Sequence, residues 1–274
     1  MASKKKPDFE TLVDVPGYRI PGSNLDSGAR KRVDNLGDNA PIFEDRVSVI
    51  PQREWDDIYQ DYKPSLRPCV KKIKNQKREG SCTANAGTGA YETIAVQQYG
   101  EANWIEMSAI SLYKRCGRSP SSGSSVGCNL KELRDRGALP THAEKDKLEK
   151  LGLDPGHTMP ETGFYTRFPS GWEETAKHFR IVEYFDVGSI EGFFSALLQG
   201  FTLHYGRRGH SIYAVAAIKR GGKWYAEYAN SWAPSWGDNG FGYDTLSGLR
   251  DSIGRYGAYA YRDVTLPLLK APGQ

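Results

Sequence analysis

The order of secondary-structure patterns along the chain constrains its fold more than any other feature. Helix patterns come first, at residues 81–99, 108–114, 130–136 and 143–151. After Gly163 the pattern changes, and strands are predicted at residues 176–185, 211–218, 224–228 and 257–264, with one amphipathic helix at 189–198. The turn at residues 219–222 is predicted to join two of these strands as a hairpin. The chain is therefore expected to have an α+β fold, helical first and mostly β later.

The length and composition of the chain fit one large domain or two lobes. It has 274 residues, of which 38% are hydrophobic and 26% charged, which is ample for a core. Residues 46–265 are expected to form the globular unit, and residues 266–274 a C-terminal tail. Residues 1–45 are polar and rich in Gly, Pro and Asn, so we expect an arm there rather than a core-forming unit. The lysines at positions 4–6 belong either to a solvated tail or to an arm that docks on a larger assembly.

The composition also disfavours several classes of protein. No apolar run approaches the roughly 20 residues that span a bilayer, and no apolar segment of a secretory signal follows the N-terminal Met. We therefore expect a cytoplasmic or assembly-associated protein. The formal charge of +4 does not by itself indicate nucleic-acid binding. The cysteines form no CxxC pair and the histidines are scattered, which argues against a structural zinc site.

Three residue types that a thiol nucleophile needs occur in the order Cys82, His210 and Asn230. Cys82 follows Gly80 and Ser81 at the predicted start of a helix, where the helix dipole favours a thiolate. His210 directly precedes an apolar strand pattern, and Asn230 ends the next strand. In such a set the Cys attacks, the His takes and returns a proton, and the Asn orients the imidazole.

Gln76 adds an oxyanion donor to this set, because it lies six residues before Cys82. Its side-chain amide and the backbone N–H of Cys82 are the two expected donors. Trp232 and Trp236 follow Asn230 on a Gly-rich loop. Trp232 is expected to cover the His–Asn hydrogen bond, and Trp236 to line the leaving-group side of the cleft.

Each of these residues also has a plain structural interpretation. A lone Cys is often a small buried hydrophobe, and a Gln or His in a loop is often only solvated. Asn230 could be a turn residue, and either Trp could belong to the core. His204 is a rival for the base, but no strand pattern follows it directly. The joint occurrence of Cys82, Gln76, His210 and Asn230 at compatible places favours a catalytic site.

These motifs resemble those of the papain-like cysteine proteases. Residues 75–91 are similar to the segment around the family's nucleophile, and residues 107–116 resemble its second helix. Residues 209–241 are similar to the family's His strand and to its Asn-Ser-Trp block, which is highly specific and reads Asn230-Ser231-Trp232 in this chain. The likeness covers roughly residues 46–265.

By this resemblance the fold has two lobes, with the active cleft between them. A helical lobe is expected at about residues 75–160 and a β-barrel-like lobe at about residues 161–265. The segment from Gly127 resembles the start of the family's glycine-rich cleft wall. The resemblance therefore assigns substrate binding to five residues: Gly127, Cys128, Asn129, Trp232 and Trp236. It implies neither a metal nor an organic cofactor.

The chain departs from the family pattern in several places. Glu79 stands where the family often has a Cys, whose disulfide partner would be the counterpart of Cys128, and Thr83 stands where a Trp is usual. The polar N-terminal residues are too few to resemble an inhibitory propeptide. Cys116 and Cys128 flank a Ser/Gly loop and could pair with each other, although two reduced thiols are slightly favoured.

Basic residues come close to both halves of the predicted site in the sequence. They are Lys71, Lys72, Lys74, Lys77, Arg78, Arg207 and Arg208. One interpretation is solvated loops. The other is a cleft that favours acidic peptides or an anionic partner.

The sequence thus favours a non-secreted cysteine peptidase that cleaves a peptide or protein substrate through an acyl-enzyme. The main alternative is a structural component of a large assembly, such as a virion or secretion apparatus, that reuses the fold with an idle or rarely used site. Residues 1–45 would then dock on that assembly. A transferase or a cell-wall amidase with the same triad ranks last.

Overall fold

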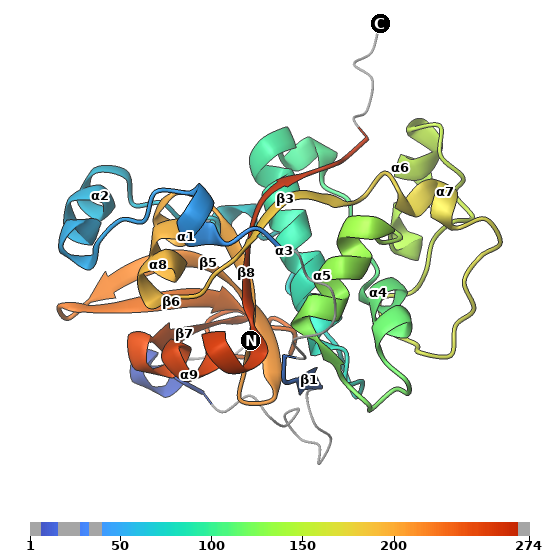
Figure 1. Cartoon of the computed structure of the whole chain (residues 1–274). Helices are drawn as coiled ribbons and strands as arrows, with labels where there is room; N and C mark the ends of the chain where they lie inside the picture. The colour runs from blue at the N-terminus through green and yellow to red at the C-terminus, as the bar shows by residue number, and fades with distance from the viewer. Residues whose placement is uncertain (1–6, 16–27, 33–39, 268–274) are drawn as a thin grey trace, which may run out of the picture.

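The computed structural model describes residues 7–15, 28–32 and 40–267. The helices of residues 109–176 gather on one side of the molecule, and the β-sheet lies on the other side together with further helices, with helix α3 (Cys82–Tyr99) between the two parts (Figure 1). The predicted α+β architecture with a helical part and a β part is therefore confirmed. Within the described ranges, none of the helices is both long and apolar enough to cross a membrane.

Helix α3 is the central element, and it is buried because its residues are small or apolar. Every residue from 82 to 96 is buried. Glycine is costly in a helix, yet here it allows the sheet to come close. A Cβ atom on Gly89 would lie 2.5 Å from the ring of Tyr213, and one on Gly87 would lie 3.3 Å from the ring of His204. The two glycines thus leave room for these two rings of the sheet.

Helices α4 (Ala109–Cys116) and α5 (Val126–Asp135) pack against α3 and against each other, and α5 also contacts the sheet. The hydroxyl of Ser108 caps α4 by accepting from the backbone N–H of Ser111 at 3.3 Å. Helix α5 begins four residues earlier than the predicted start at Leu130 because Ser125 caps it, with its hydroxyl 3.1 Å from the N–H of Cys128. The helical side also holds the short helices α6 (Lys145–Lys150) and α7 (Glu173–Ala176).

The sheet has six strands in the order β3-β8-β4-β5-β6-β7, and every neighbouring pair is antiparallel. Strand bounds are Ile181–Asp186 (β3), Thr202–Arg207 (β4), His210–Arg220 (β5), Lys223–Ala229 (β6), Phe241–Thr245 (β7) and Ala258–Val264 (β8). Strands β3 and β7 are edges and do not pair with each other. The expected β-barrel-like lobe is therefore wrong in this detail, because the sheet stays open. Its β7 edge is instead covered by the N-terminal residues, where Val13 bridges Tyr243.

The two faces of the sheet bury separate cores. One face packs against α3 through Tyr213, Tyr259 and Tyr261. The other face is covered by α8 (Ile190–Leu198), α9 (Leu246–Tyr256) and α2 (Trp55–Tyr62). On that face Trp55 stacks on Phe194 with ring centroids 4.6 Å apart.

The predicted strand at residues 176–185 begins only at Ile181. Ala176 ends helix α7 instead, and it is fully buried together with Phe179 in the core on the helical side. Burial of these residues against α5 and its neighbours outweighs their weak strand pattern. The hairpin at residues 219–222 is confirmed, since β5 and β6 pair through Arg220 and Lys223.

The described parts of residues 1–45 lie against the globular unit. Phe9 and Leu12 pack on Tyr243, and Phe43, the first residue of α1 (Phe43–Arg46), is fully buried. Strand β1 (Ala29–Arg30) pairs in parallel with β2 (Ser124–Ser125). These stretches contribute to the core, in contrast to the expected arm. Residues 1–6, 16–27, 33–39 and 268–274, which include the lysines at 4–6 and most of the predicted tail, lie outside the described residues.

Candidate active site

His210 and Asn230 are joined by a hydrogen bond, as the sequence predicted. His210 begins β5 and Asn230 follows β6, and the Nε2 atom of His210 lies 2.7 Å from Oδ1 of Asn230. Oδ1 also accepts from the backbone N–H of Ser231 at 2.7 Å, which fixes the amide orientation. Because Oδ1 can only accept, Nε2 carries the proton in this bond. The second ring nitrogen, Nδ1, has no hydrogen-bond partner among the described residues.

Trp232 stacks on the imidazole of His210. The ring centroids are 4.6 Å apart and the planes differ by 17°. Trp236 packs edge-on against Trp232 at 5.5 Å and is half-buried. Trp232 therefore shields the His–Asn pair from solvent, while Trp236 supports Trp232.

Burial makes His210 a neutral imidazole in this state of the molecule. The desolvation of the fully buried ring lowers the pKa of His210 to about 3. The hydrogen bond that His210 donates to Asn230 opposes this shift, and the charge of Arg207 adds to it. At neutral pH the buried ring is therefore uncharged, and it is a weak base as long as it stays buried.

His204, the rival for the base, is engaged elsewhere. Its Nδ1 atom lies 2.7 Å from the hydroxyl of Tyr261, and its Nε2 atom lies 3.1 Å from the hydroxyl of Ser211. Burial lowers the pKa of His204 to about 3. Both ring nitrogens have protein partners, so His204 is part of the packing between α3 and the sheet.

Cys82 begins helix α3, with Ser81 directly before it. The residue is fully buried, and it takes part in no disulfide. Its position at the first turn of an 18-residue helix places the sulfur where the helix dipole favours negative charge. The start of the predicted helix at Ser81 or Cys82 and its end at Tyr99 are confirmed.

Gln76 is fixed between the two halves of the molecule. Its Nε2 atom donates to the carbonyl of Glu79 at 2.7 Å, and its Oε1 atom accepts from the hydroxyl of Ser231 at 2.7 Å. Its backbone N–H donates to the carbonyl of Ser231 at 2.9 Å. The amide is therefore held at a set orientation, and its partner Ser231 belongs to the same block as Asn230 and Trp232.

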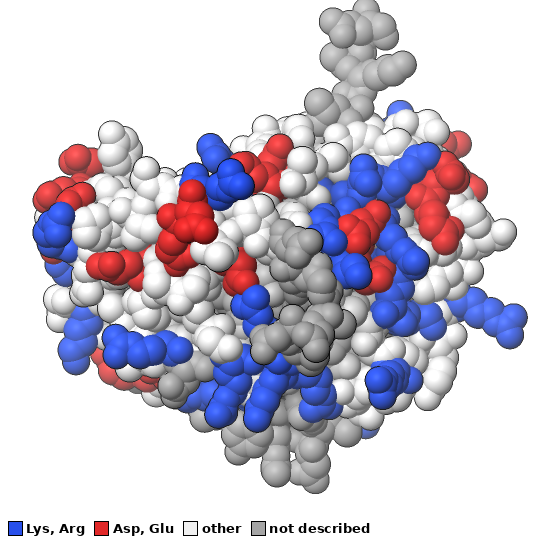
Figure 2. All heavy atoms as spheres, viewed as in Figure 1, with Lys and Arg blue, Asp and Glu red and all other residues white. Residues whose placement is uncertain are grey.

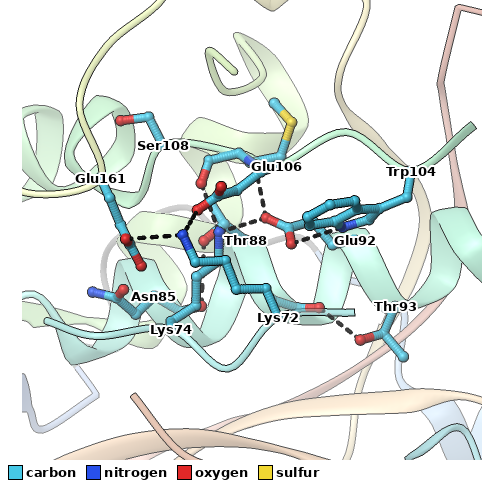
Figure 3. Close-up of polar contacts among 12 residues, drawn as sticks. Lys72, Lys74, Asn85, Thr88, Glu92, Thr93, Trp104, Glu106, Ser108 and Glu161 are labelled. Atoms are coloured by element: carbon cyan, nitrogen blue, oxygen red, sulfur yellow. Dashed lines mark hydrogen bonds and ion pairs between the residues drawn. The ribbon is translucent and has the colours of Figure 1, made fainter. Parts of the chain in front are cut away.

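A buried ion pair anchors the segment that carries Gln76. The ammonium of Lys74 lies 2.5 Å from Oε1 of Glu92 and 2.7 Å from the carbonyl of Met107 (Figure 3). The side chains of Lys74 and Glu92 are 1% and 5% exposed. The carbonyl of Lys74 also accepts from the N–H of Ala233 at 3.1 Å. Lys74 thus links helix α3 to the block after β6, a role that the sequence did not reveal.

Glu79, which stands where the family often has a Cys, forms hydrogen bonds instead of a disulfide. Its Oε1 atom accepts from the backbone N–H groups of Gly163 and Phe164 at 3.0 and 2.8 Å. A carboxylate therefore holds the 163–164 segment near the start of α3, where the family pattern would have a disulfide.

Gly127, Cys128 and Asn129, which the resemblance places at the start of a cleft wall, lie at the start of a helix. All three belong to α5, and the side-chain nitrogen of Asn129 is buried and donates to Thr83, Ser124 and Ser125. Ser125 caps this helix directly before the three residues, and the substrate-binding role that the resemblance implies for them stays a prediction.

Cys116 and Cys128 form a disulfide, so the slightly favoured interpretation of two reduced thiols is also wrong. The two residues lie near the end of α4 and the start of α5, which pack together. The disulfide closes the loop between residues 116 and 128. Packing of these two helices brings the sulfurs together, and the spacing alone could not show this.

A segment of the chain itself crosses the space between the two halves of the site. The N–H of Ser124 donates to the carbonyl of Gly28 at 2.8 Å, and the N–H of Ala29 donates to the carbonyl of Gly209 at 2.9 Å. Ser124 belongs to the helical side, and Gly209 directly precedes His210. Residues 28–30 therefore lie in the space between the two halves of the site, which we call the cleft, and no sequence pattern indicates this contact.

Most of the basic residues near the site are paired with acids. Four of the seven form ion pairs: Lys71 with Glu101, Lys72 with Glu106 and Glu161, Lys74 with Glu92, and Arg207 with Asp244. Lys77, Arg78 and Arg208 are exposed. On the face drawn in Figure 2, basic and acidic side chains are interspersed in the upper part, and basic side chains prevail in the lower part. The charges of the four paired residues are compensated within the chain.

Comparison with known proteins identifies the fold. No protein-family model and no curated protein matches the sequence. Among solved structures, the chain is similar to xylellain, a cysteine protease from Xylella fastidiosa. The two sequences are 14% identical, the match covers 88% of this chain and 98% of xylellain, and the TM-score is 0.57. It is also similar to digestive procathepsin L 3 from the larval midgut of Tenebrio molitor, with 17% identity, 74% and 69% coverage and a TM-score of 0.56.

A third similar structure is that of procathepsin B from Trypanosoma congolense. It has 13% identity, 86% coverage of each chain and a TM-score of 0.53. These three proteins share the papain-like fold, and so does this chain. The resemblance drawn from the sequence motifs is therefore confirmed at the level of the fold.

Proposed function

We propose that this chain is a cysteine peptidase in which Cys82 is the nucleophile, His210 the base and then the acid, and Asn230 the residue that orients His210. The thiol proton passes to Nδ1 of His210 while the sulfur attacks the carbonyl carbon of a peptide bond. Gln76 and the N–H of Cys82 donate to the oxyanion that forms.

The acyl-enzyme then forms and is released in balanced steps. His210 returns its proton to the leaving amine as the C–N bond breaks, which leaves a thioester on Cys82. Water attacks the thioester, and His210 takes a proton from that water. Cys82 regains the proton when the carboxylic acid product leaves.

The geometry of His210 supports this proposal most strongly. Its Nε2 atom is held by Asn230 at 2.7 Å and its ring is stacked on Trp232, while Nδ1 has no partner among the described residues. An imidazole that is fixed by one nitrogen and has the other available is the arrangement that a general base requires.

Labelling with an epoxide that attacks papain-type thiolates, followed by mass spectrometry, tests the proposal. The full chain carrying Gly28→Ala, which displaces residues 28–30, is compared with the same chain after Cys82→Ala, His210→Ala or the control Cys69→Ala, which changes the other described thiol outside the disulfide. Modification of Cys82 that is lost in His210→Ala and kept in Cys69→Ala supports the peptidase. Equal labelling with and without His210 contradicts it. Hydrolysis of a casein substrate, absent in Cys82→Ala, tests turnover itself.

A structural role in a larger assembly is the second candidate. Two observations favour it: residues 28–30 occupy the cleft, and burial lowers the pKa of His210 to about 3, so the ring carries no charge that would stabilise a thiolate. An idle site predicts no labelling of Cys82 even in variants that displace this segment. It also predicts that removal of residues 1–6 abolishes incorporation into the assembly while leaving the fold intact by circular dichroism.

A further inference from the structure

Gly28 lies where the chain passes between two glycines of the cleft, and there is no room for a side chain. A Cβ atom on Gly28 would lie 2.0 Å from the carbonyl oxygen of Gly80, far inside van der Waals contact. Next to Gly80, a Cβ on Gly123 would lie 2.2 Å from the carbonyl oxygen of Gly28. Gly28 also has φ of +105°, which L side chains rarely adopt. The backbone of Gly28 thus meets the backbone of both glycines directly.

The contacts along this path recognise a peptide backbone. The carbonyl of Gly28 accepts from the N–H of Ser124 at 2.8 Å, and the N–H of Ala29 donates to the carbonyl of Gly209 at 2.9 Å. Both partners are main-chain groups of the cleft. Any peptide that follows the same path can form these bonds, provided that it has glycine at the narrow point.

The narrow point lies beside the proposed catalytic residues. Gly80 is two residues before Cys82, and Gly209 is the residue before His210. A chain bound between Gly80, Ser124 and Gly209 therefore passes next to the nucleophile and the base.

Several contacts hold the segment around Gly123 in place. A Cβ on Gly80 would lie 3.1 Å from the backbone nitrogen of Gly123, so these two glycines are neighbours on the helical side of the cleft. The hydroxyl of Tyr113 accepts from that N–H at 3.0 Å and donates to the carbonyl of Ser119 at 2.8 Å. The disulfide between Cys116 and Cys128 closes the same loop.

We propose that the cleft selects peptides with a glycine at the position that passes between Gly80 and Gly123, and that Gly28 is the chain's own example of this ligand. The inference rests on the proposed function for its consequence that substrates of the peptidase contain this glycine. Binding itself needs no thiol chemistry, so the two proposals can fail separately.

The first test changes Gly28 in the full chain. In Gly28→Ala the new methyl group clashes with Gly80, so the segment leaves the cleft. Cys82 is then expected to react with a small thiol reagent at least about tenfold faster than in the wild type. This change in rate corresponds to about 1.4 kcal/mol. The matched control is Gly100→Ala, because Gly100 has φ of +82° but nothing within 4 Å of its added Cβ. Unchanged reactivity in Gly28→Ala, or an equal rise in Gly100→Ala, overturns the inference.

The second test adds the ligand from outside. Fluorescein-labelled peptides with the sequence of residues 24–34 are titrated into full-length Gly28→Ala and followed by anisotropy. The peptide with Gly at position 28 is expected to bind at least about tenfold more tightly than the one with Ala. A peptide that carries Lys31→Ala is the control, because Lys31 is exposed. If Gly28→Ala does not fold, Ala29→Pro replaces it, since it removes the N–H that bonds to Gly209.

The outcomes separate the two proposals. Equal binding of the Gly and Ala peptides, or no binding of either, overturns the glycine requirement. Selective binding of the Gly peptide without hydrolysis of any substrate supports the glycine site and leaves only the peptidase in error. Hydrolysis that does not depend on glycine leaves the peptidase standing and overturns this inference.

Discussion

The helical half and the sheet half of the site are held in different ways. On the helical side, Lys74 and Glu92 form a buried ion pair whose atoms all find partners: Glu92 also accepts from the N–H of Met107 at 2.8 Å and from the indole of Trp104 at 3.2 Å. On the sheet side, Arg207 and Asp244 form a second buried pair at 3.2 Å, but Oδ1 of Asp244 has no partner among the described residues.

The difference lies in what each pair is connected to. Lys74 holds the segment of Gln76 through contacts within the globular unit. Arg207 donates to the carbonyl of Val15 at 2.6 Å, and the carboxylate of Asp14 accepts from the hydroxyl of Thr245 at 2.6 Å. The N-terminal residues are thus tied to the sheet half, close to His210. The Lys74–Glu92 pair thus finds all its side-chain partners within residues 74–107, whereas Arg207 of the second pair also donates to the N-terminal residue Val15.

Removal of Lys74 is expected to have the largest effect. Lys74→Met leaves the carboxylate of Glu92 buried without its cation. The free energy of unfolding of this variant should therefore be about 3–5 kcal/mol lower than that of the wild type. Lys72→Met is the matched control, because the side chain of Lys72 is 38% exposed in its ion pairs with Glu106 and Glu161. It should cost less than about 1 kcal/mol. Urea denaturation of both variants checks this, and similar losses would show that the buried pair is not special.

The pair on the sheet side should respond to pH. Burial raises the pKa of Asp244 from its ordinary value of 3.8 to about 6. The folded state therefore holds a proton on Asp244 that the unfolded state has lost, and this contribution to stability falls as pH rises from about 4 to about 6, by up to about 3 kcal/mol.

Asp244→Asn isolates this contribution. Since Asn cannot ionise, the variant should gain stability relative to the wild type as pH rises through that window, and the difference should level off above about pH 7. Denaturation midpoints of both proteins across pH 4–8 provide the measurement. A difference that stays constant with pH contradicts the raised pKa.

The aromatic stack on His210 should give the smallest effect. Trp232→Leu removes a ring contact that is worth about 0.5–1.5 kcal/mol, so the labelling rate of Cys82 should fall by up to about tenfold. Trp236→Leu serves as the control, because Trp236 touches Trp232 rather than His210. Equal rates in the two variants would mean that the stack does not orient the imidazole.

The sequence predicted the elements whose signals are local. Helix α3 was predicted to its last residue because small and apolar residues run from Cys82 to Tyr99, and Ser189 marked the start of α8. Strand β4 and helix α9 were not predicted. Strand β4 is short and mixes His204 and Arg207 with apolar residues, and both polar side chains are buried only because Ser211, Tyr261 and Asp244 provide partners from other strands.

The site shows the same division. Cys82, His210, Asn230 and Gln76 could be proposed from residue types and order. The hydrogen bonds that hold these residues in place could not be predicted. Lys74 and Glu92 are 18 residues apart in the sequence, and Gln76 and Ser231 are 155 residues apart. Such contacts depend on packing between distant segments. The glycine passage formed by Gly28, Gly80 and Gly123 is hidden for the same reason.

The pH profile of Cys82 labelling in the wild type, Gly28→Ala and Gly28→Ala/His210→Ala tests the central claim that a working thiol site lies under the chain's own segment. We predict slow labelling of the wild type that rises only near the pKa of an ordinary thiol, about 8.5. Gly28→Ala should label well below pH 7, because solvent then reaches His210 and allows it to carry the proton, and the double variant should lose this reactivity. Labelling of Gly28→Ala that follows the wild-type profile would contradict the account.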